Sequence, residues 1–214
     1  MVKVKICGLS TEETLSAALE AGADYVGLVF YQPSPRHLTI EQARPLAEQA
    51  RGKAKIVALT VDPDNELIDA IATVIKPDYI QCHGSESPER VSEISTRTGI
   101  AVIKAIKVRD EKDVESAAPY EGIASMLLFD AKVPEGFANP LPGGNGVRFD
   151  WSLLDARKGA SGFMLSGGID MENVAQAIDI AKPAIIDVSS GVESAPGVKD
   201  AGLVREFVER IKGL

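Results

Sequence analysis

Four side chains that can exchange protons or hold charge stand at the ends of four short apolar runs: Cys7, His83, Asp130 and Asp187. A thiol and two carboxylates can act as general acids and bases, and an imidazole can orient or relay a proton. If the runs are parallel β-strands, their ends meet at one edge, so the four groups would converge there. Each residue alone also fits a packing or capping role, and the hypothesis of a catalytic site rests on their joint occurrence.

Two glycine-containing turns and one arginine predict a site for an anion. Ser166-Gly167-Gly168 and Ser189-Ser190-Gly191 follow the seventh and eighth apolar runs. In many α/β barrels the loops after these strands offer backbone N–H groups to a phosphate. Arg36 follows the second run in a proline-stiffened loop, where its guanidinium suits a carboxylate or a phosphate. The residues expected to bind phosphate are Gly167, Gly168, Ser189, Ser190 and Gly191.

The composition narrows the class of protein. The chain has 214 residues, of which 45% are apolar, enough for one sizeable core. No apolar run approaches the roughly 18–20 residues of a membrane helix, and residues 1–9 read as a strand rather than a signal peptide. A net charge of −8 argues against a nucleic-acid-binding surface. Two cysteines, Cys7 and Cys82, cannot build a disulfide framework, which favours a reducing compartment.

These features together predict a cytoplasmic enzyme that acts on a small phosphorylated molecule. We expect no nucleic-acid partner and no membrane partner, and a monomer or a homodimer. The only histidines, His37 and His83, form no recognisable metal-ligand spacing with the cysteines. The residues themselves therefore require no metal, although Asp130 and Asp187 could bind Mg²⁺.

Strands and helices are expected to alternate along the whole chain. Strict alternation predicts parallel strands, and eight strand–helix units predict a (β/α)8 TIM barrel, one catalytic domain over residues 1–214. A doubly wound open sheet is the competitor, but it usually has about five or six strands and a G-x-G-x-x-G turn after the first, which is missing here. The expected strands are 2–7, 25–30, 55–61, 79–83, 101–107, 126–131, 162–166 and 184–189. The expected helices are 11–21, 39–51, 65–75, 88–98, 110–118, 151–157, 170–181 and 200–212.

Strand parity predicts which side chains face the inside of the barrel. Alternate residues of a barrel strand point inward and outward. In the first strand the apolar alternates belong against the helices, so Lys5 and Cys7 face inward. The same parity turns His83 inward and leaves Cys82 in the helix layer as a core residue. The inward polar residues come last or nearly last in their strands, at the rim where barrel enzymes carry their chemistry.

Local signals refine the helices and one loop. Ser10 or Thr11 is expected to cap the first helix, and Gly99 to end the fourth in a left-handed conformation. Pro45 should kink the second helix or shift its start, because proline lacks the N–H and its ring clashes with the preceding turn. Residues 133–149 are rich in proline and glycine, and so long a loop in a compact domain is usually a functional lid or disordered.

An ordered series of short motifs spans nearly the whole chain and resembles the phosphoribosylanthranilate isomerase family. The motifs are Lys5-Ile6-Cys7-Gly8, Gly27-Leu28-Val29-Phe30, Ser34-Pro35-Arg36, Gln81-Cys82-His83-Gly84, Gly143-Gly144-Asn145-Gly146, Phe149-Asp150-Trp151, Ser166-Gly167-Gly168, Asp187 to Glu193 and Pro196 to Asp200. The resemblance implies a (β/α)8 barrel of tryptophan biosynthesis. It implies an Amadori rearrangement of N-(5-phosphoribosyl)anthranilate without cofactor or metal.

The resemblance also implies roles for individual residues. Cys7 corresponds to the general base and Asp130 to the general acid of the family. Arg36 corresponds to the contact with the anthranilate carboxylate, and His83 and Asp187 to residues that line the site. From the residues themselves we add one hypothesis: Lys5, two residues from Cys7 on the same strand face, could lower the pKa of the thiol.

Two alternatives stay open at this point. Another enzyme on the same fold, such as a ribulose-phosphate epimerase or an aldolase, would use the same phosphate loops. An epimerase needs paired carboxylates, often with a metal, and an aldolase needs a Schiff-base lysine, for which Lys104 is the only tempting residue. A barrel that only binds a sugar phosphate is the second alternative, and it would need neither Cys7 nor Asp130.

Overall fold

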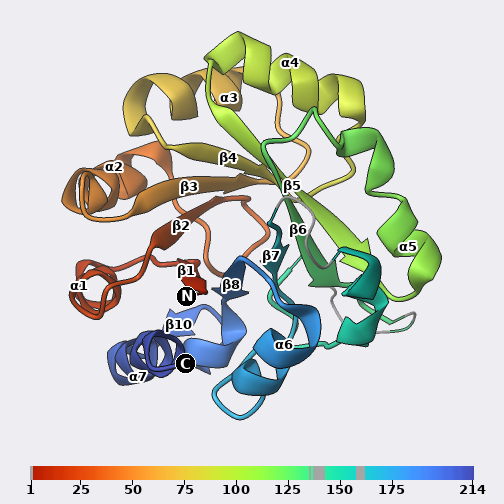
Figure 1. The fold of residues 1–214 in the computed structure, drawn as a ribbon. Helices are drawn as coiled ribbons and strands as arrows, with labels where there is room; N and C mark the ends of the chain where they lie inside the picture. The colour runs from red at the N-terminus through yellow and green to blue at the C-terminus, as the bar shows by residue number, and fades with distance from the viewer. Residues whose placement is uncertain (1, 135, 137–142, 158–161) are drawn as a thin grey trace.

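Eight parallel strands close into a barrel, and helices surround them on the outside (Figure 1). The structure is a computed structural model that describes residues 2–134, 136, 143–157 and 162–214. Each strand pairs with the next in the chain, and β8 returns to pair with β1. The predicted (β/α)8 barrel is therefore confirmed. The strands are β1 (Lys3–Cys7), β2 (Tyr25–Phe30), β3 (Lys55–Thr60), β4 (Tyr79–Cys82), β5 (Ala101–Val108), β6 (Met126–Ala131), β7 (Met164–Leu165) and β8 (Ile185–Val188).

The helices follow the expected positions, and several are shorter than expected. Irregular helical turns replace part of the expected α-helix after β3, after β5 and between β6 and β7: a π-helical turn at Ile71–Ile75 and 3-10 helices at Ala118–Tyr120 and Trp151–Arg157. The α-helices are α1 (Glu12–Glu20), α2 (Ile40–Ala50), α3 (Asn65–Ala70), α4 (Pro88–Thr98), α5 (Glu111–Glu115), α6 (Val174–Ala181) and α7 (Ala201–Lys212).

The caps that the sequence indicates are present. Thr11 rather than Ser10 caps α1, because its side chain accepts a hydrogen bond from the N–H of Thr14. Gly99 ends α4 with φ of 68°, the left-handed conformation expected there. Pro45 does not shift the start of α2, which is fixed at Thr39 by a capping box and runs unbroken through the proline.

The barrel interior and the helix layer are separate apolar clusters, as parity requires. The interior cluster is small, and the larger cluster lies between the strands and the helices. Cys82 belongs to the outer cluster, as expected, and Lys5 is fully buried inside the barrel. The interior cluster consists of Tyr25, Val57, Ile103, Ala105, Leu128, Met164 and Ile185.

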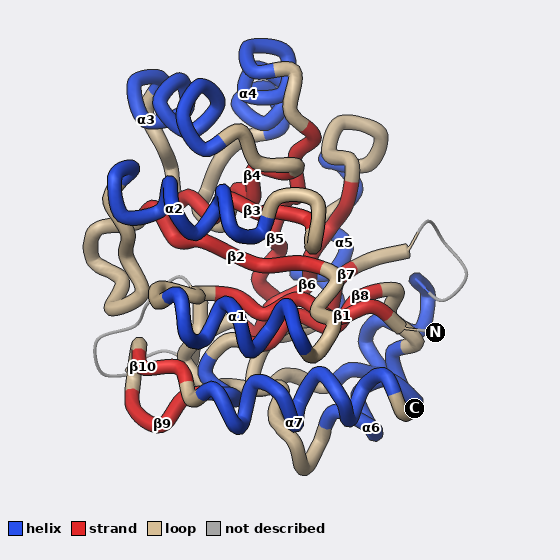
Figure 2. Tube along the Cα trace, turned by 90° about the vertical axis from the view of Figure 1, so that its left-hand side faces the viewer, coloured by secondary structure: helices blue, strands red, loops and turns tan. Residues whose placement is uncertain are grey.

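A two-stranded antiparallel hairpin follows the barrel, formed by β9 (Glu193–Ala195) and β10 (Val198–Lys199). It lies at the end of the molecule opposite the two termini (Figure 2). Because it follows β8, it stands beside the carboxyl ends of the strands, where the predicted site lies. Within the described ranges, no helix is long and apolar enough to cross a membrane.

Candidate active site

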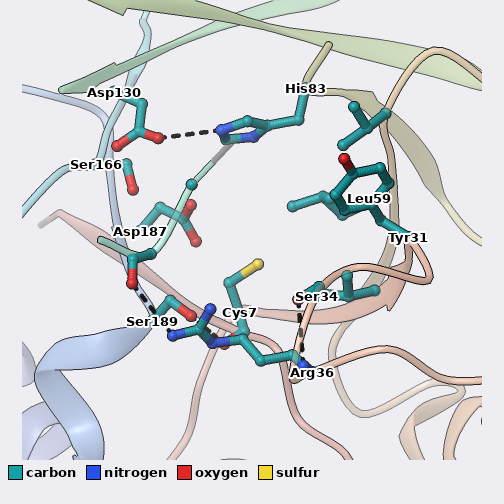
Figure 3. A pocket seen from close by; sticks show the side chains of 14 residues that line it. Cys7, Tyr31, Ser34, Arg36, Leu59, His83, Asp130, Ser166, Asp187 and Ser189 are labelled. Atoms are coloured by element: carbon teal, nitrogen blue, oxygen red, sulfur yellow. Dashed lines mark hydrogen bonds and ion pairs between the residues drawn. The ribbon is translucent and has the colours of Figure 1, made fainter. Parts of the chain in front are cut away.

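The five side chains predicted to act on or bind the substrate meet in one pocket at the carboxyl ends of the strands (Figure 3). They are Cys7, Arg36, His83, Asp130 and Asp187. The pocket contains about 480 Å³ of empty space, including its open mouth. Cys7, Asp130 and Asp187 lie on β1, β6 and β8, His83 directly follows β4, and Arg36 lies on a loop, so the barrel closure itself brings these groups together. Apolar and polar side chains lie on different sides of the pocket.

One side of the pocket is apolar and the other is polar. Tyr31 and Leu59 lie together on the apolar side, with Val29 and Val61 also lining the pocket. Asp130 and Ser166 lie on the opposite side in Figure 3, and the Cys7 sulfur projects between the two sides. A ligand with a flat apolar ring at one end and polar groups at the other would match this division.

A second, polar pocket of about 340 Å³ of empty space adjoins the first and is formed by the predicted phosphate loops. Gly167, Gly168, Ser189 and Ser190 line it, together with residues of the glycine-rich loop that ends at Gly146. The fifth residue predicted for phosphate is not among its lining residues. A Cβ on Gly191 would collide with the carbonyl of Ile169, so Gly191 serves the close packing of the two phosphate loops.

The Cys7 thiol lies in a buried and highly charged environment. Lys5, on the same strand, donates a hydrogen bond of 2.8 Å to Asp187, and both side chains are almost completely buried. Burial raises the pKa of the Cys7 thiol above its usual value, and the Asp187 carboxylate raises it further. Lys5 and Lys199 lower the pKa of Cys7, but they do not prevail. Lys5 therefore acts on the thiol in the expected direction, but burial, together with the Asp187 carboxylate, outweighs it, so the net pKa of Cys7 is raised.

His83 connects Asp130 to a buried amide. The Nε2 of His83 lies 3.0 Å from Oδ2 of Asp130, and its Nδ1 lies 2.8 Å from Nε2 of Gln81. The amide nitrogen of Gln81 can only donate, so in this orientation Nδ1 accepts and His83 donates from Nε2 to the carboxylate. The Oε1 of Gln81 is buried and has no hydrogen-bond partner among the described residues. His83 is thus placed to orient the Asp130 carboxyl group.

Arg36 forms an ion pair with a residue that the sequence predictions did not single out for the site. Its Nε donates to Oε1 of Glu193 at 2.7 Å, and its Nη2 donates to Oε2 at 2.8 Å. Lys199 also donates to Glu193. Arg36 is only 4% exposed, unlike a solvated surface arginine. Glu193 and Lys199 lie in motifs of the family resemblance. The sequence could have indicated their role only through two opposite charges on either side of the Pro196-Gly197 turn.

The end of the glycine-rich loop approaches two of the predicted residues. A Cβ on Gly143 would lie 2.8 Å from Nε2 of His83, and a Cβ on Gly144 would lie 2.6 Å from Nη1 of Arg36. Only glycine leaves room for both side chains at these positions. The expected lid over 133–149 lies partly outside the described residues, which resume at Gly143.

Lys104 does not enter the barrel. It stands between the interior residues Ile103 and Ala105, so its side chain points to the helix layer, where it contacts Glu86 at 2.7 Å. A lysine in this place cannot form a Schiff base with a ligand in the mouth of the barrel. In the described part of the chain, no cluster of three or more His, Cys, Asp or Glu could hold a metal ion.

Comparison with known proteins identifies close relatives over the full length. A family model described as N-(5′-phosphoribosyl)anthranilate (PRA) isomerase matches residues 4–210. The N-(5′-phosphoribosyl)anthranilate isomerase of Paramagnetospirillum magneticum is 49% identical over 212 residues, covering 99% of this chain and 98% of that protein. The crystal structure of the phosphoribosyl anthranilate isomerase of Thermotoga maritima aligns with a TM-score of 0.88 and 39% identity, covering 100% of both chains. Another phosphoribosyl anthranilate isomerase, in complex with reduced 1-(o-carboxyphenylamino)-1-deoxyribulose 5-phosphate, aligns with a TM-score of 0.85 and 37% identity, also covering 100% of both chains.

Proposed function

The chain belongs to the N-(5′-phosphoribosyl)anthranilate isomerase family, and from this premise we propose that Cys7 and Asp130 are its general base and general acid. The reaction is an isomerisation in tryptophan biosynthesis. It converts N-(5′-phosphoribosyl)anthranilate to 1-(2-carboxyphenylamino)-1-deoxyribulose 5-phosphate. The observation that carries the assignment is the pocket in which a thiol and a carboxyl group face the same space beside a phosphate-type site.

The chemistry needs one proton donor and one proton acceptor. Asp130 donates a proton to the ring oxygen of the ribose while the bond from that oxygen to C1′ breaks, leaving an iminium between C1′ and the aryl nitrogen. Cys7, as the thiolate, takes the proton from C2′, and those electrons form the C1′–C2′ double bond of an enolamine. The enolamine then tautomerises to the C2′ ketone as Cys7 returns its proton to C1′ and Asp130 takes the proton of the C2′ hydroxyl, which restores both residues. The iminium serves as the electron sink, and atoms and charge balance within the substrate and the two residues.

The two sides of the pocket support one orientation of the substrate. The phosphate would bind at Gly167, Gly168, Ser189 and Ser190, which line the polar pocket and can offer backbone N–H groups. The aryl ring would lie against the apolar side, with its carboxylate at Arg36. The ribose then spans the space between Cys7 and Asp130. His83 would orient Asp130, and Asp187 would hold Lys5 under the thiol.

The test is the loss of fluorescence of phosphoribosylanthranilate, formed in situ, with three proteins: wild type, Cys7→Ala and Asp130→Asn. We expect wild-type turnover and a fall in kcat of about two to four orders of magnitude in each variant, which is the typical contribution of a positioned acid or base. The matched control is Cys82→Ala, because that thiol lies in the helix layer and should leave turnover within a factor of about three.

The outcomes separate the possible readings. Inert wild-type protein would overturn the isomerase assignment, and ribulose 5-phosphate with divalent metals would be the next substrate. Wild-type turnover that survives Cys7→Ala would keep the reaction and remove the thiol from its role. Binding of the reduced product analogue without turnover in wild type would favour a barrel that only binds sugar phosphates.

Five further features of the protein are proposals on the same premise. Residues 1–214 act as one catalytic domain, the enzyme works in the cytoplasm, and it needs no cofactor. Its partner is the phosphorylated substrate, with neither nucleic acid nor membrane involved. Its state is a monomer or a homodimer, and light scattering coupled to size-exclusion chromatography distinguishes the two directly.

A further inference from the structure

The β9–β10 hairpin lies beside the pocket, and the described parts of the other strand–helix units contain no counterpart of it. It carries Glu193 at its beginning and Lys199 at its end, and both side chains are directed to Arg36 or to its ion pair. Glu193 and Lys199 are 3% and 1% exposed at their side chains. Burial of two charged groups on an excursion of a few residues is costly unless the charges serve a purpose there.

Glu193 fixes one edge of the Arg36 guanidinium. Its two oxygens accept from Nε and Nη2 of Arg36 at 2.7 and 2.8 Å, which is the bidentate geometry of an arginine–carboxylate pair. Nη2 also donates to the carbonyl of Gly144 at 3.3 Å. Among the described residues none accepts from Nη1, which belongs to the edge that remains available to a ligand. The pair therefore sets the plane and the direction of the guanidinium.

Lys199 keeps this cluster positive. Two cations share the single carboxylate of Glu193, so the three side chains together carry a net charge of +1 while Lys199 is protonated. Burial lowers the pKa of Lys199, and the Glu193 carboxylate opposes this shift. Burial raises the pKa of Glu193, but the hydrogen bonds from Arg36 and the charge of Lys199 outweigh burial and lower the pKa, so Glu193 stays ionised. Without Lys199 the Arg36–Glu193 pair would be neutral and would attract an anionic ligand less strongly.

The hairpin turn also contacts the Arg36 loop through its backbone. A Cβ on Gly197 would lie 2.8 Å from the carbonyl oxygen of Pro35, so the turn packs directly against the residue before Arg36. The N–H of Gly197 donates to Oε2 of Glu193 at 3.1 Å, which ties the turn to the ion pair. The hairpin thus contacts both the backbone before Arg36 and its side chain.

We propose that the β9–β10 hairpin is a specificity device, in which Glu193 positions Arg36 and Lys199 keeps the cluster positive so that the site selects ligands with a carboxylate on the aryl ring. This inference rests on the proposed function of the pocket. Glu193 and Lys199 do not contact the reacting atoms, so they are positioning residues. Their effect should appear in the binding of the ring carboxylate and should vanish for a ligand that lacks it.

The experiment compares two ligands that differ only in that carboxylate. They are the reduced product analogue, with a carboxyphenylamino group, and its phenylamino counterpart, each titrated by calorimetry into wild type, Glu193→Gln and Lys199→Met. We expect each variant to weaken binding of the carboxylate ligand by roughly 10- to 100-fold, as for the loss of one charge-assisted contact. Binding of the phenylamino ligand should change by less than about threefold.

Kinetics and a second variant test the positioning role. With the natural substrate, Glu193→Gln should raise KM by a factor similar to the binding loss and change kcat much less, because uniform binding is removed. Glu193→Asp, which keeps the charge, should recover part of the loss. In an Arg36→Met background, Glu193→Gln should add nothing, because its effect passes through Arg36.

A variant in another buried ion pair controls for general damage. Glu86 pairs with Lys104 at 2.7 Å with similarly low exposure, but in the helix layer. Glu86→Gln should lower the urea midpoint and leave the ratio of the two dissociation constants unchanged. Equal losses for both ligands in Glu193→Gln and Lys199→Met would overturn the proposal and assign the hairpin a structural role. Failure of wild type to bind either ligand would instead overturn the proposed function.

Discussion

At the scale of single residues, the chemistry of the pocket depends on which buried charged groups interact with each other. Lys5 faces two anionic partners, the Asp187 carboxylate and the Cys7 thiolate, and the carboxylate takes the 2.8 Å hydrogen bond. The pKa of Lys5 is raised, because these two partners together outweigh burial. Burial and the Asp187 carboxylate outweigh the effect of Lys5 on the thiol, so the pKa of Cys7 is raised. Activity that depends on the thiolate should therefore rise with pH over the range in which Cys7 ionises.

Replacement of Asp187 by Asn should make Cys7 more acidic. The change removes a negative charge that raises the pKa of the thiol and frees Lys5 to interact with the thiolate, so the curve of alkylation rate against pH should move to lower pH. The rate of reaction with iodoacetamide in a Cys82→Ala background measures this curve for Cys7, which is then the remaining cysteine of the chain.

Lys199→Met supplies the opposite sign. Lys199 lowers the pKa of Cys7, so its removal should move the alkylation curve to higher pH.

Breaking the buried Lys5–Asp187 pair costs about 3–5 kcal/mol, and circular dichroism must show that Asp187→Asn is folded before the curves are compared. Curves that coincide in all three proteins would contradict this account of the thiol.

Strand parity predicts site residues well when they lie on the strands and poorly when they lie beyond them. The alternation placed Cys7 and His83 in the barrel mouth, because it needs only the direction of each strand. It could not reveal the ion pair between Asp187 and Lys5, because that contact depends on how β1 pairs with β8. Nor could it reveal Glu193 and Lys199, whose approach to Arg36 is set by a hairpin turn and a neighbouring loop.

At the scale of elements, the regular strands were predictable to within one or two residues and the helix ends less so. Thr39 and Ser87 mark helix starts because their side chains accept hydrogen bonds from backbone N–H groups of the first turn, and such capping residues can be recognised in a sequence. The expected helix over 170–181 begins only at Val174, because the side chains of Asp170 and Asn173 satisfy backbone groups of the preceding turn. Such local competition between turn and helix has no periodic signal in the sequence.

Helix α2 should gain stability when its proline is removed. Pro45 lacks the N–H that would bond to the carbonyl of Glu41, and both residues are exposed, so Pro45→Ala restores one bond without disturbing the core. A helix-interior proline costs about 3 kcal/mol, and its restriction of the unfolded chain returns up to about 1, so we expect a gain of roughly 2 kcal/mol.

Urea unfolding measures the gain, and a neighbouring exposed residue controls for it. Arg44→Ala removes only a surface ion pair with Glu48 and should change the free energy of unfolding by less than about 1 kcal/mol. A Pro45→Ala protein that is no more stable than wild type would show that the missing hydrogen bond costs this helix nothing.

At the scale of the whole molecule, the shortest described strand of the barrel lies where the phosphate loops meet. β7 contains two residues and pairs with β6 and with β8 over two positions each, whereas β2 and β3 pair over six. Few ladder hydrogen bonds hold this part of the barrel, so it should open more readily than the rest. The phosphate pocket is lined by residues after β6, β7 and β8, so a ligand there connects all three strands.

Binding of a phosphate-bearing ligand should therefore protect β7 from hydrogen exchange. Anything that binds only the closed form stabilises it by about 2.7 kcal/mol at a hundredfold excess over Kd, so amides near Met164 and Leu165 should slow by roughly a hundredfold. Mass spectrometry of peptides from this strand measures the effect, with peptides from β2 and β3 as the control that changes little. Gly168→Ala, whose Cβ would collide with Arg148, should remove the protection. Uniform slowing of all strands would mean that the barrel opens as one unit, and β7 would then not be its weakest point.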